Sequence, residues 1–503
     1  MMLGGRLSYQ NSGFIAATAI GLVVLLLTIG YAPTAKALPS YARQTGQPCG
    51  TCHTDFAGLT PYGRLFKIQG YTAGGGPYRS TLFPDGSGGK PYVPPLLAKS
   101  LPPPDSNNNA GNDEKPYVPP IAMMAIVGFT NTQAPMPPPT APYNANNNVV
   151  VSPVSFFYGG AITDHIGTFA QVTWNAPPAG GFGTDPFAAH TWTWDNTDVR
   201  YADSARFGIF NVTYGITANN NPTVQDPWNT TPAWAFPYAV STFGSGFGPT
   251  PILDGAFAAH VVSAGAYAFI NDTLYLETTV YTTLNPFTQN DLGVDPFDAP
   301  GLFDAAPYWR VAFEPHWGNN WLEVGTFGMT ANVHPWIAAG TTLTATFPQT
   351  DNYTDIGFDT QYQYQGDNFW ITLRSSYIHE YQNLNASFAN GLAFNPNNTL
   401  NEARAYASLA YGNSNRIVLT GQYFNSWGSP DAFLYASNAN FSPNTNGWIA
   451  EIAYIPFINS QAPGWPWFNM RLGLQYTWYT EFNGTSVGAS ANNTLFLYAW
   501  FAM

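Results

Sequence analysis

The strongest constraint on the fold is a two-residue alternation of apolar and polar side chains, which recurs in short segments through the C-terminal three quarters of the chain. In one such segment, Trp309 and Val311 face one way and Arg310 faces the other. This period predicts β-strands with one apolar face. Only 9% of the residues are charged and 16% are aromatic, whereas about 25% are charged in typical soluble proteins. Alternating strands with so little charge predict an all-β fold, a transmembrane β-barrel.

We expect a porin-like outer-membrane barrel of sixteen strands, joined alternately by short turns and longer loops. The expected strands are 121–132, 152–163, 167–175, 191–201, 206–218, 260–270, 273–283, 308–316, 320–331, 353–364, 369–381, 401–411, 416–426, 447–456, 469–481 and 493–502. Charged residues on their polar faces should line the lumen, namely Glu277, Arg310, Glu314, Asp355, Asp359, Arg374, Arg404 and Arg471.

The long loop 219–259 is unusual because it contains Trp228, Trp234 and Phe236. We expect it to fold onto the rim or into the lumen and to narrow the outer mouth. The alternative is contact with the lipid interface, which Trp also favours.

The N-terminus has the features of a secretory signal peptide. Arg6 is the only charge before Lys36, residues 14–29 form an apolar stretch, and a small residue precedes and follows Lys36, as at a cleavage site. We expect cleavage near Ala37; a single membrane anchor is the alternative. Because no later run approaches the roughly 20 apolar residues of a spanning helix, export and a barrel together indicate the outer membrane of a Gram-negative-type bacterium.

Charge is unevenly distributed along the chain. Residues 38–115 carry four Lys and three Arg against five acids, whereas residues 116–503 carry seven Arg against 24 acids. A nucleic-acid partner is therefore disfavoured, because it would need clustered positive charge. The acidic excess fits either solvated extracellular loops or a lumen that attracts cations.

The two cysteines of the chain form the run Cys49-Gly50-Thr51-Cys52-His53. C-x-x-C-H is the covalent attachment motif of c-type haem, in which each thiol binds one vinyl group and the histidine becomes the proximal iron ligand. A disulfide would leave His53 unexplained, and a zinc site would need a fourth ligand. We therefore predict one covalent haem c, held by Cys49, Cys52 and His53.

The sixth iron ligand is not evident from a motif. His and Met are the usual donors, and the methionines nearest to the haem motif are Met123, Met124 and Met136. We expect Met124 or Met123, although a lone Met in a strand more often serves packing.

The haem motif lies in a segment too small to form a core of its own. One short helix is expected near 61–69, with Pro61 at its start, and the following stretch is rich in Gly, Pro and Asn. This segment must borrow its packing, and we expect it to plug the lumen. The predicted organisation is a signal peptide (1–37), a haem-binding segment (38–76), a linker (77–120) and a barrel (121–503).

Three runs around the haem motif are distinctive: Ala-Arg-Gln-Thr-Gly at 42–46, Gly-Arg-Leu-Phe-Lys at 63–67 and Gly-Tyr-Thr at 70–72. With the haem motif they resemble the fused cytochrome–porin family of iron-oxidising bacteria. The resemblance implies one N-terminal haem c joined to a sixteen-stranded outer-membrane barrel. It implies oxidation of extracellular Fe(II) and transfer of the electrons to periplasmic carriers. It also implies that Cys49 and Cys52 attach the haem and that His53 is its proximal ligand.

Three functions remain open at this point. The first is an outer-membrane electron-transfer cytochrome which, if catalytic, is an Fe(II):cytochrome c-type oxidoreductase. The second is a diffusion porin with a haem-bearing plug, and the third is a haem peroxidase-like enzyme. The expected partners are the outer membrane, Fe(II) or another external electron donor and a periplasmic electron carrier, with no nucleic acid.

Overall fold

A computed structural model describes residues 38–72, 120–135, 144–163, 165–175, 192–296, 299–335, 349–459 and 464–503. The expected signal peptide (1–37) and the expected linker as far as residue 119 lie outside the described residues, as does Met136. The expectations for these parts of the chain stay predictions.

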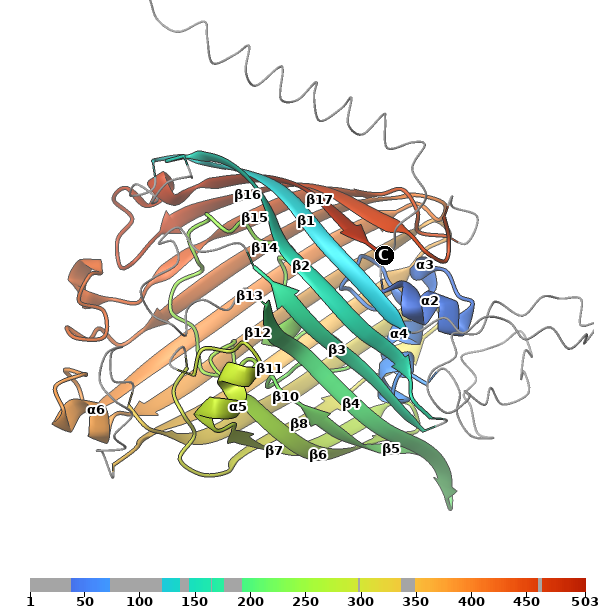
Figure 1. The fold of residues 1–503 in the computed structure, drawn as a ribbon, viewed down its shortest axis with the longest axis horizontal. Helices are drawn as coiled ribbons and strands as arrows, with labels where there is room; N and C mark the ends of the chain where they lie inside the picture. Colours follow the sequence, from blue (N-terminus) through green and yellow to red (C-terminus); the bar gives the residue numbers. More distant parts are fainter. Residues whose placement is uncertain are drawn as a thin grey trace, which may run out of the picture.

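The strands form one antiparallel sheet that closes on itself (Figure 1). β1 pairs with β2 on one side and with β17, the last strand, on the other. β8 and β9 both pair with β10 and make one interrupted strand, so the described residues form a closed barrel of sixteen strands, as predicted. The strands are β1 (Ile121–Thr132), β2 (Asn147–Ala161), β3 (Ile166–Trp174), β4 (Trp192–Phe207), β5 (Phe210–Asn219), β6 (Val261–Ile270), β7 (Leu274–Thr283), β8 (Ala306–Phe313), β9 (His316–Trp317), β10 (Asn320–Val333), β11 (Asp351–Gln365), β12 (Phe369–Asn383), β13 (Asn397–Tyr411), β14 (Arg416–Gly428), β15 (Thr445–Ile455), β16 (Asn469–Glu481) and β17 (Thr494–Ala502).

Four predicted strand boundaries are wrong by four or more residues: the end of β4 and the starts of β2, β5 and β13. We expected a break between 201 and 206, but β4 continues to Phe207 and the turn lies at Gly208-Ile209. Gly208 has a φ of 62°, which glycine adopts without steric cost. β2 begins at Asn147, five residues earlier than expected, because its polar first residues still pair with the end of β1.

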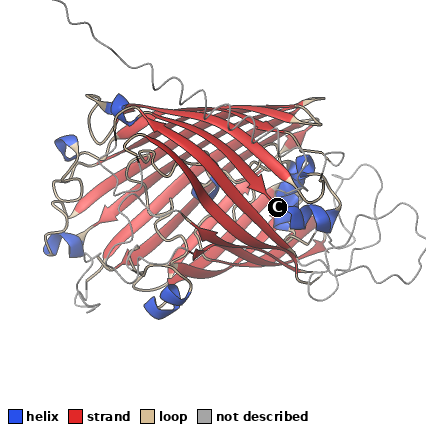
Figure 2. Ribbon diagram, turned by 45° about the horizontal axis from the view of Figure 1, so that its top comes forward, coloured by secondary structure: helices blue, strands red, loops and turns tan. Residues whose placement is uncertain are grey.

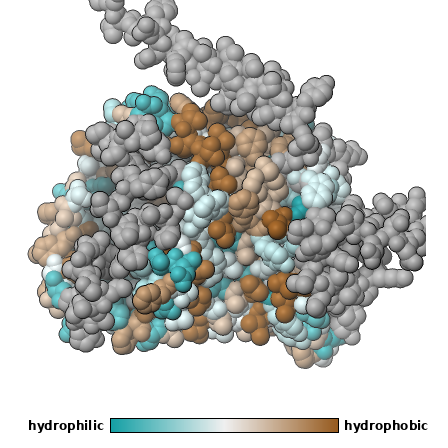
Figure 3. All heavy atoms as spheres, in the orientation of Figure 1, coloured by the Kyte–Doolittle hydropathy of each residue, from teal (hydrophilic) through white to brown (hydrophobic). Residues whose placement is uncertain are grey.

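The two faces of the wall differ sharply. On β8, Trp309 and Val311 are exposed on the outside, while Arg310 between them is fully buried on the inside. Figure 3 shows apolar residues spread over the outer surface of the strands. A closed barrel satisfies all its backbone hydrogen bonds internally, and its apolar outer face is then suited to lipid. The chain is therefore an outer-membrane β-barrel protein.

Among the described residues, no helix is both long and apolar enough to cross a membrane. The helices are short and lie at the ends of the wall or in loops (Figure 2). They are α2 (Pro39–Thr45), α3 (Cys49–Cys52), α4 (Pro61–Ile68), α5 (Pro286–Asp291) and α6 (Asn385–Ala389). α4 lies where the sequence predicted a helix.

The N-terminal segment, residues 38–72, lies at the end of the barrel that carries the short turns (Figure 1). Gly50 N–H donates to the carbonyl of Ile458, in the connection between β15 and β16, at 2.9 Å. Arg416, the first residue of β14, donates to the carbonyl of His53 at 2.8 Å. Short turns face the periplasm in bacterial barrels, so we assign this end to the periplasm and the long-loop end to the outside.

The long connection between β5 and β6, residues 220–260, folds into the lumen, which confirms the expectation for this loop; we call it the inner loop. Its members include side chains without solvent exposure, such as Val224, Trp228 and Phe257. It forms hydrogen bonds or ion pairs with nine strands of the wall: with β1, β4, β7, β8, β11, β12, β13, β14 and β16 through Thr130, Arg200, Glu277, Arg310, Asp359, Arg374, Arg404, Gln422 and Gln475.

This filling leads to a prediction for ion conductance. The described residues of the N-terminal segment and of the inner loop each contact the wall on several sides and so narrow the aqueous path through the barrel. In planar bilayers, the purified protein should pass a current far below that of an open sixteen-stranded porin measured in the same salt. A stable current of porin size would contradict the closed lumen.

Candidate functional site

The haem motif forms a single helical turn, α3, followed by an extended residue. Cys49 and Cys52 stand three residues apart and therefore share one face of that turn. Thr60 fixes the next turn, because its backbone N–H donates to the carbonyl of Cys52 at 2.9 Å while its hydroxyl caps α4 through Gly63 N–H at 3.2 Å. Gly63 lies so close to α3 that an added Cβ would be 2.3 Å from the oxygen of Cys52. Only glycine allows α3 and α4 to pack this closely.

Ion pairs attach the N-terminal segment to the wall. Arg64 of α4 donates to Glu314 at 2.7 Å, and Asp55 accepts from Arg471 of β16 at 2.8 Å. All four side chains are at least nine-tenths buried. The segment is too short to form a core of its own and packs against the barrel instead, as the sequence predicted.

A cavity of about 350 Å³ lies between the N-terminal segment, the inner loop and the wall. Cys49, Cys52 and His53 border it, and so do both Met123 and Met124 of β1. The structure thus brings together the five residues that the sequence singled out, although Met123 and Met124 are some 70 residues from the motif.

The register of β1 distinguishes the two methionines. Ala122 and Ile126 are buried on the lumen side, at 3% and 2% exposure, and alternate residues of a strand share a face. Met124 therefore points into the lumen, where it packs beside Phe66 and Phe157. Met123 also borders the cavity, but it alternates with Met124 along the strand, so the side chain of Met124 is the better placed of the two.

The protonation states suit a buried binding site. Burial lowers the pKa of His53 to about 4, so its imidazole is neutral at pH 7, which is the form that binds metal ions. Burial likewise raises the pKa of Cys52 to about 12 and raises that of Cys49. Both cysteines are free thiols. These donor atoms, on one cavity, fit a covalently attached haem.

Lys67 connects the N-terminal segment with the inner loop. Its Nζ donates to the carbonyls of Val224 at 2.8 Å and Asp226 at 2.7 Å, and to Asn229 Oδ1 at 3.1 Å. It also lies 4.7 Å from the ring centre of Trp234. Burial lowers the pKa of Lys67 to about 7, and Arg200 nearby adds to this effect. The sequence analysis did not identify Lys67 as a contact residue, although Arg64 and Lys67 are three apart and share one face of the predicted helix.

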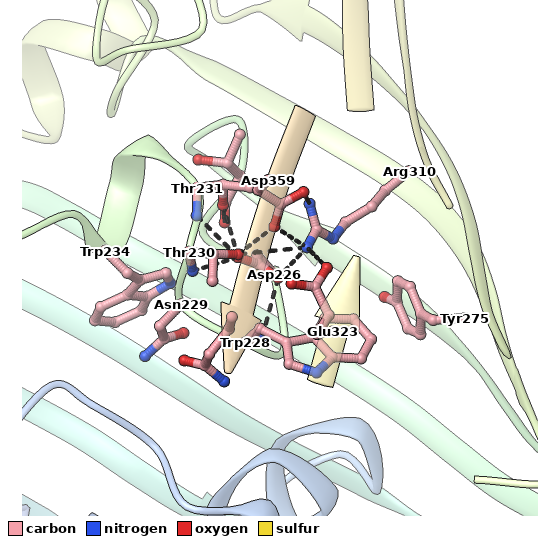
Figure 4. Close-up of polar contacts among 12 residues, drawn as sticks. Asp226, Trp228, Asn229, Thr230, Thr231, Trp234, Tyr275, Arg310, Glu323 and Asp359 are labelled. Carbon is pink, nitrogen blue, oxygen red and sulfur yellow. Dashed lines mark hydrogen bonds and ion pairs between the residues drawn. The ribbon is translucent and has the colours of Figure 1, made fainter. Parts of the chain in front are cut away.

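Arg310 of β8 is the centre of a second buried cluster, which joins the inner loop to the wall (Figure 4). Its Nη2 lies 2.7 Å from Asp359 of β11, 3.2 Å from Glu323 of β10 and 3.2 Å from Asp226 of the inner loop. Asp226 also accepts from the backbone N–H of Trp228 at 3.0 Å. One guanidinium thus binds three carboxylates, and through Asp226 it attaches the inner loop to the wall.

The lumen prediction is confirmed for all eight charged residues named from the sequence. Seven of them are less than 9% exposed, and Arg404 forms ion pairs with Asp254 of the inner loop and with Glu402 beside it on β13. Alternation alone revealed their orientation. It did not reveal their partners, because Asp55, Asp226 and Asp254 lie in segments without a strand pattern.

Comparisons with known proteins agree with the type of barrel. No family model matches the chain, and no curated protein matches it. Solved structures with a similar barrel include OprB of Pseudomonas putida, with 11% identity and a TM-score of 0.43 over 76% of this chain and 93% of that one. OmpF of Salmonella typhi, in complex with daunomycin, has 10% identity and a TM-score of 0.40 over 76% and 97%. OmpT of Vibrio cholerae has 10% identity and a TM-score of 0.39 over 76% and 96%. These similarities are too low to support an argument. The fold assignment therefore rests on the closed ladder of strands itself.

The Arg310 cluster leads to a prediction for stability. Arg310→Gln leaves three buried carboxylates without their shared cation, and breaking a buried ion pair costs about 3–5 kcal/mol. We expect a loss of this size in the free energy of unfolding, measured by urea titration in lipid vesicles. Arg206→Gln is the matched control, since Arg206 is exposed beside the β4–β5 turn and its loss should change stability by less than about 0.5 kcal/mol. Equal midpoints for the two variants would contradict the role of Arg310.

Proposed function

We propose that the protein is an outer-membrane electron-transfer cytochrome, which accepts electrons from extracellular Fe(II) and passes them to a periplasmic carrier. The observation that carries the proposal is the shared cavity of Cys49, Cys52, His53 and Met124. These residues supply two thioether positions, a neutral imidazole and a thioether sulfur. C-x-x-C-H is the attachment spacing of c-type haem, and imidazole and methionine sulfur are both ligands of haem iron.

The residues present fit a c-type haem. Cys49 and Cys52 would hold it covalently, and His53 and Met124 would donate to its iron. When bound, the group supplies reversible one-electron chemistry at the iron. The chain itself surrounds the cavity with Phe157, Phe169 and Trp234. Such an apolar shell limits the access of water and tunes the redox potential.

The arrangement of the chain suits electron transfer across the membrane better than solute transport. The haem segment belongs to the end that we assign to the periplasm, where a soluble carrier can approach it. The inner loop extends from the long-loop end to the cavity, which it lines with Asn229, Trp234 and Tyr238. Acidic groups on the outer side would raise the local concentration of a divalent cation, an effect that weakens with salt.

Two other functions remain as alternatives, a diffusion porin and a peroxidase-like enzyme. The sixteen-stranded barrel, taken alone, favours a diffusion porin in which residues 38–72 act as a haem-bearing plug, but the filled lumen disfavours it. A peroxidase-like enzyme would need an open sixth position on the iron. Met124 on the cavity disfavours that function.

The proposal is tested by haem content and by reduction kinetics in the same preparation. The wild-type protein should retain haem after denaturing electrophoresis, and Fe(II) should reduce it in stopped-flow experiments. Cys49→Ala combined with Cys52→Ala should abolish covalent haem and leave the barrel assembled, because the closing ladder involves neither residue. A haem-free wild type would refute the cytochrome, and a haem that Fe(II) cannot reduce would refute the donor.

The assignment of Met124 has its own test. Met124→Leu conserves volume but removes the sulfur, so the haem spectrum should change from six-coordinate low-spin to five-coordinate and the iron should bind carbon monoxide. Met123→Leu is the matched control on the opposite face of β1 and should leave the spectrum unchanged. If both variants keep the wild-type spectrum, another residue is the sixth ligand.

A further inference from the structure

Two carboxylates face each other inside the barrel near its long-loop end. Asp355 of β11 is the direct register partner of Glu380 of β12, and each residue is only 1% exposed. Like charges directly opposite in a ladder destabilise a sheet, and buried charges are normally paired or coordinate a metal. Such a pair is relieved either by one proton shared between the two carboxyl groups or by a bound cation.

Among the described residues, no basic side chain bonds to the pair, and His379, next to Glu380 in the sequence, is hydrogen-bonded to Asn401 instead. Glu380 accepts from the backbone N–H of Ile252 at 2.6 Å, and Asp355 Oδ2 accepts from that of Leu253 at 2.9 Å. Both donors are neutral peptide groups of the inner loop. Arg404, on the neighbouring strand β13, is bonded to other carboxylates.

Unused oxygen atoms surround the pair. Oδ1 of Asp355 and Oε1 of Gln382 are buried and have no hydrogen-bond partner among the described residues. Gln382 is 7% exposed, and its amide nitrogen donates to Glu380 Oε1 at 2.6 Å. That bond holds the amide group at the carboxylate pair. Two buried acceptors thus lie beside two negative charges, and a cation would satisfy all of them.

We propose that Asp355, Glu380 and the side-chain oxygen of Gln382 bind one divalent cation. Carboxylate and amide oxygens are hard ligands that suit Mg²⁺, Mn²⁺, Ca²⁺ or Fe²⁺, and water molecules commonly complete the coordination shell of such ions. In the part of the chain that the structure describes, no group of three or more His, Cys, Asp and Glu side chains is arranged to hold a metal. The amide oxygen and water molecules would therefore complete a site whose charge comes from the two carboxylates.

The position of the site suggests which cation it serves. β11 begins at Asp351 and β12 ends at Asn383, so the pair lies within four residues of the long-loop end. The pair therefore lies nearer to the outside than the cavity on the periplasmic side does. If the proposed function holds, the physiological cation is Fe(II), bound on its way to oxidation. Only this identity rests on the proposed function, because cation binding itself needs no haem.

The experiment uses the full protein in detergent with Mn²⁺ as the probe. The electron paramagnetic resonance signal of free Mn²⁺ should fall during titration until one ion is bound per chain. Asp355→Asn and Glu380→Gln each remove a ligand charge. Loss of a mere outer-shell partner weakens metal sites about 10–100-fold, so each variant should bind at least about tenfold more weakly. Gln382→Leu keeps both charges and should weaken binding less.

The matched control is Asp304→Asn, which removes an exposed acid at the same end of the barrel and should leave Mn²⁺ binding unchanged. Heat-dependent gel migration verifies that each variant is folded. The proposal fails if the wild type binds no Mn²⁺ saturably, or if Asp355→Asn binds it as tightly as the wild type. It fails too if infrared spectra reveal a protonated carboxyl group that Asp355→Asn removes, since the pair would then share a proton. Failure of haem attachment would leave the Mn²⁺ result unchanged, so the two proposals fail separately.

Discussion

Buried ion pairs between the wall and its two insertions determine how this barrel is filled. The N-terminal segment contributes Asp55 to Arg471 and Arg64 to Glu314. The inner loop contributes Asp226 to Arg310, and it contributes Asp254 to Arg404. Removing one partner of a buried pair is costly, whereas the complete pair adds little net stability. The main effect of these pairs is therefore to select one arrangement of the N-terminal segment and the inner loop, rather than to raise total stability. The geometry of the cavity depends on that arrangement.

The barrel was predictable from sequence because its cause is local. A membrane leaves no water for backbone groups, so the strands must close, and each strand then repeats an outward and an inward face. That period is visible in about ten consecutive residues of a strand. The boundary between β4 and β5 was missed because residues 202–205 continue the ladder and Gly208 alone marks the turn. The break between β8 and β9 falls at Pro315, which cannot donate to a ladder.

The site was predictable only in part. The spacing of Cys49, Cys52 and His53 is a local signal, and it identified one side of the cavity. The other side depends on contacts between residues far apart in sequence, such as Asp55 with Arg471, which are 416 positions apart. No periodic pattern encodes such a pairing. Met124 is an intermediate case, since its inward face follows from alternation along β1 but its place opposite the haem motif does not.

The same contacts constrain the order in which the molecule assembles. Residues 38–72 are bonded to β1 through Arg43 and the carbonyl of Ile121 at 2.6 Å, and to β14 and β16 through Arg416 and Arg471. These strands come from opposite ends of the barrel sequence, and they become neighbours of one site only when β17 pairs with β1. Contacts between residues far apart in sequence require a loss of loop-closure entropy before their favourable interactions form. We therefore expect residues 38–72 to dock after the barrel has closed, because the cavity is completed by the wall and the inner loop as well as by the segment itself. A covalent bond to the cofactor would suit such an order, because it keeps the group attached to a segment that has no enclosing core of its own until docking is complete.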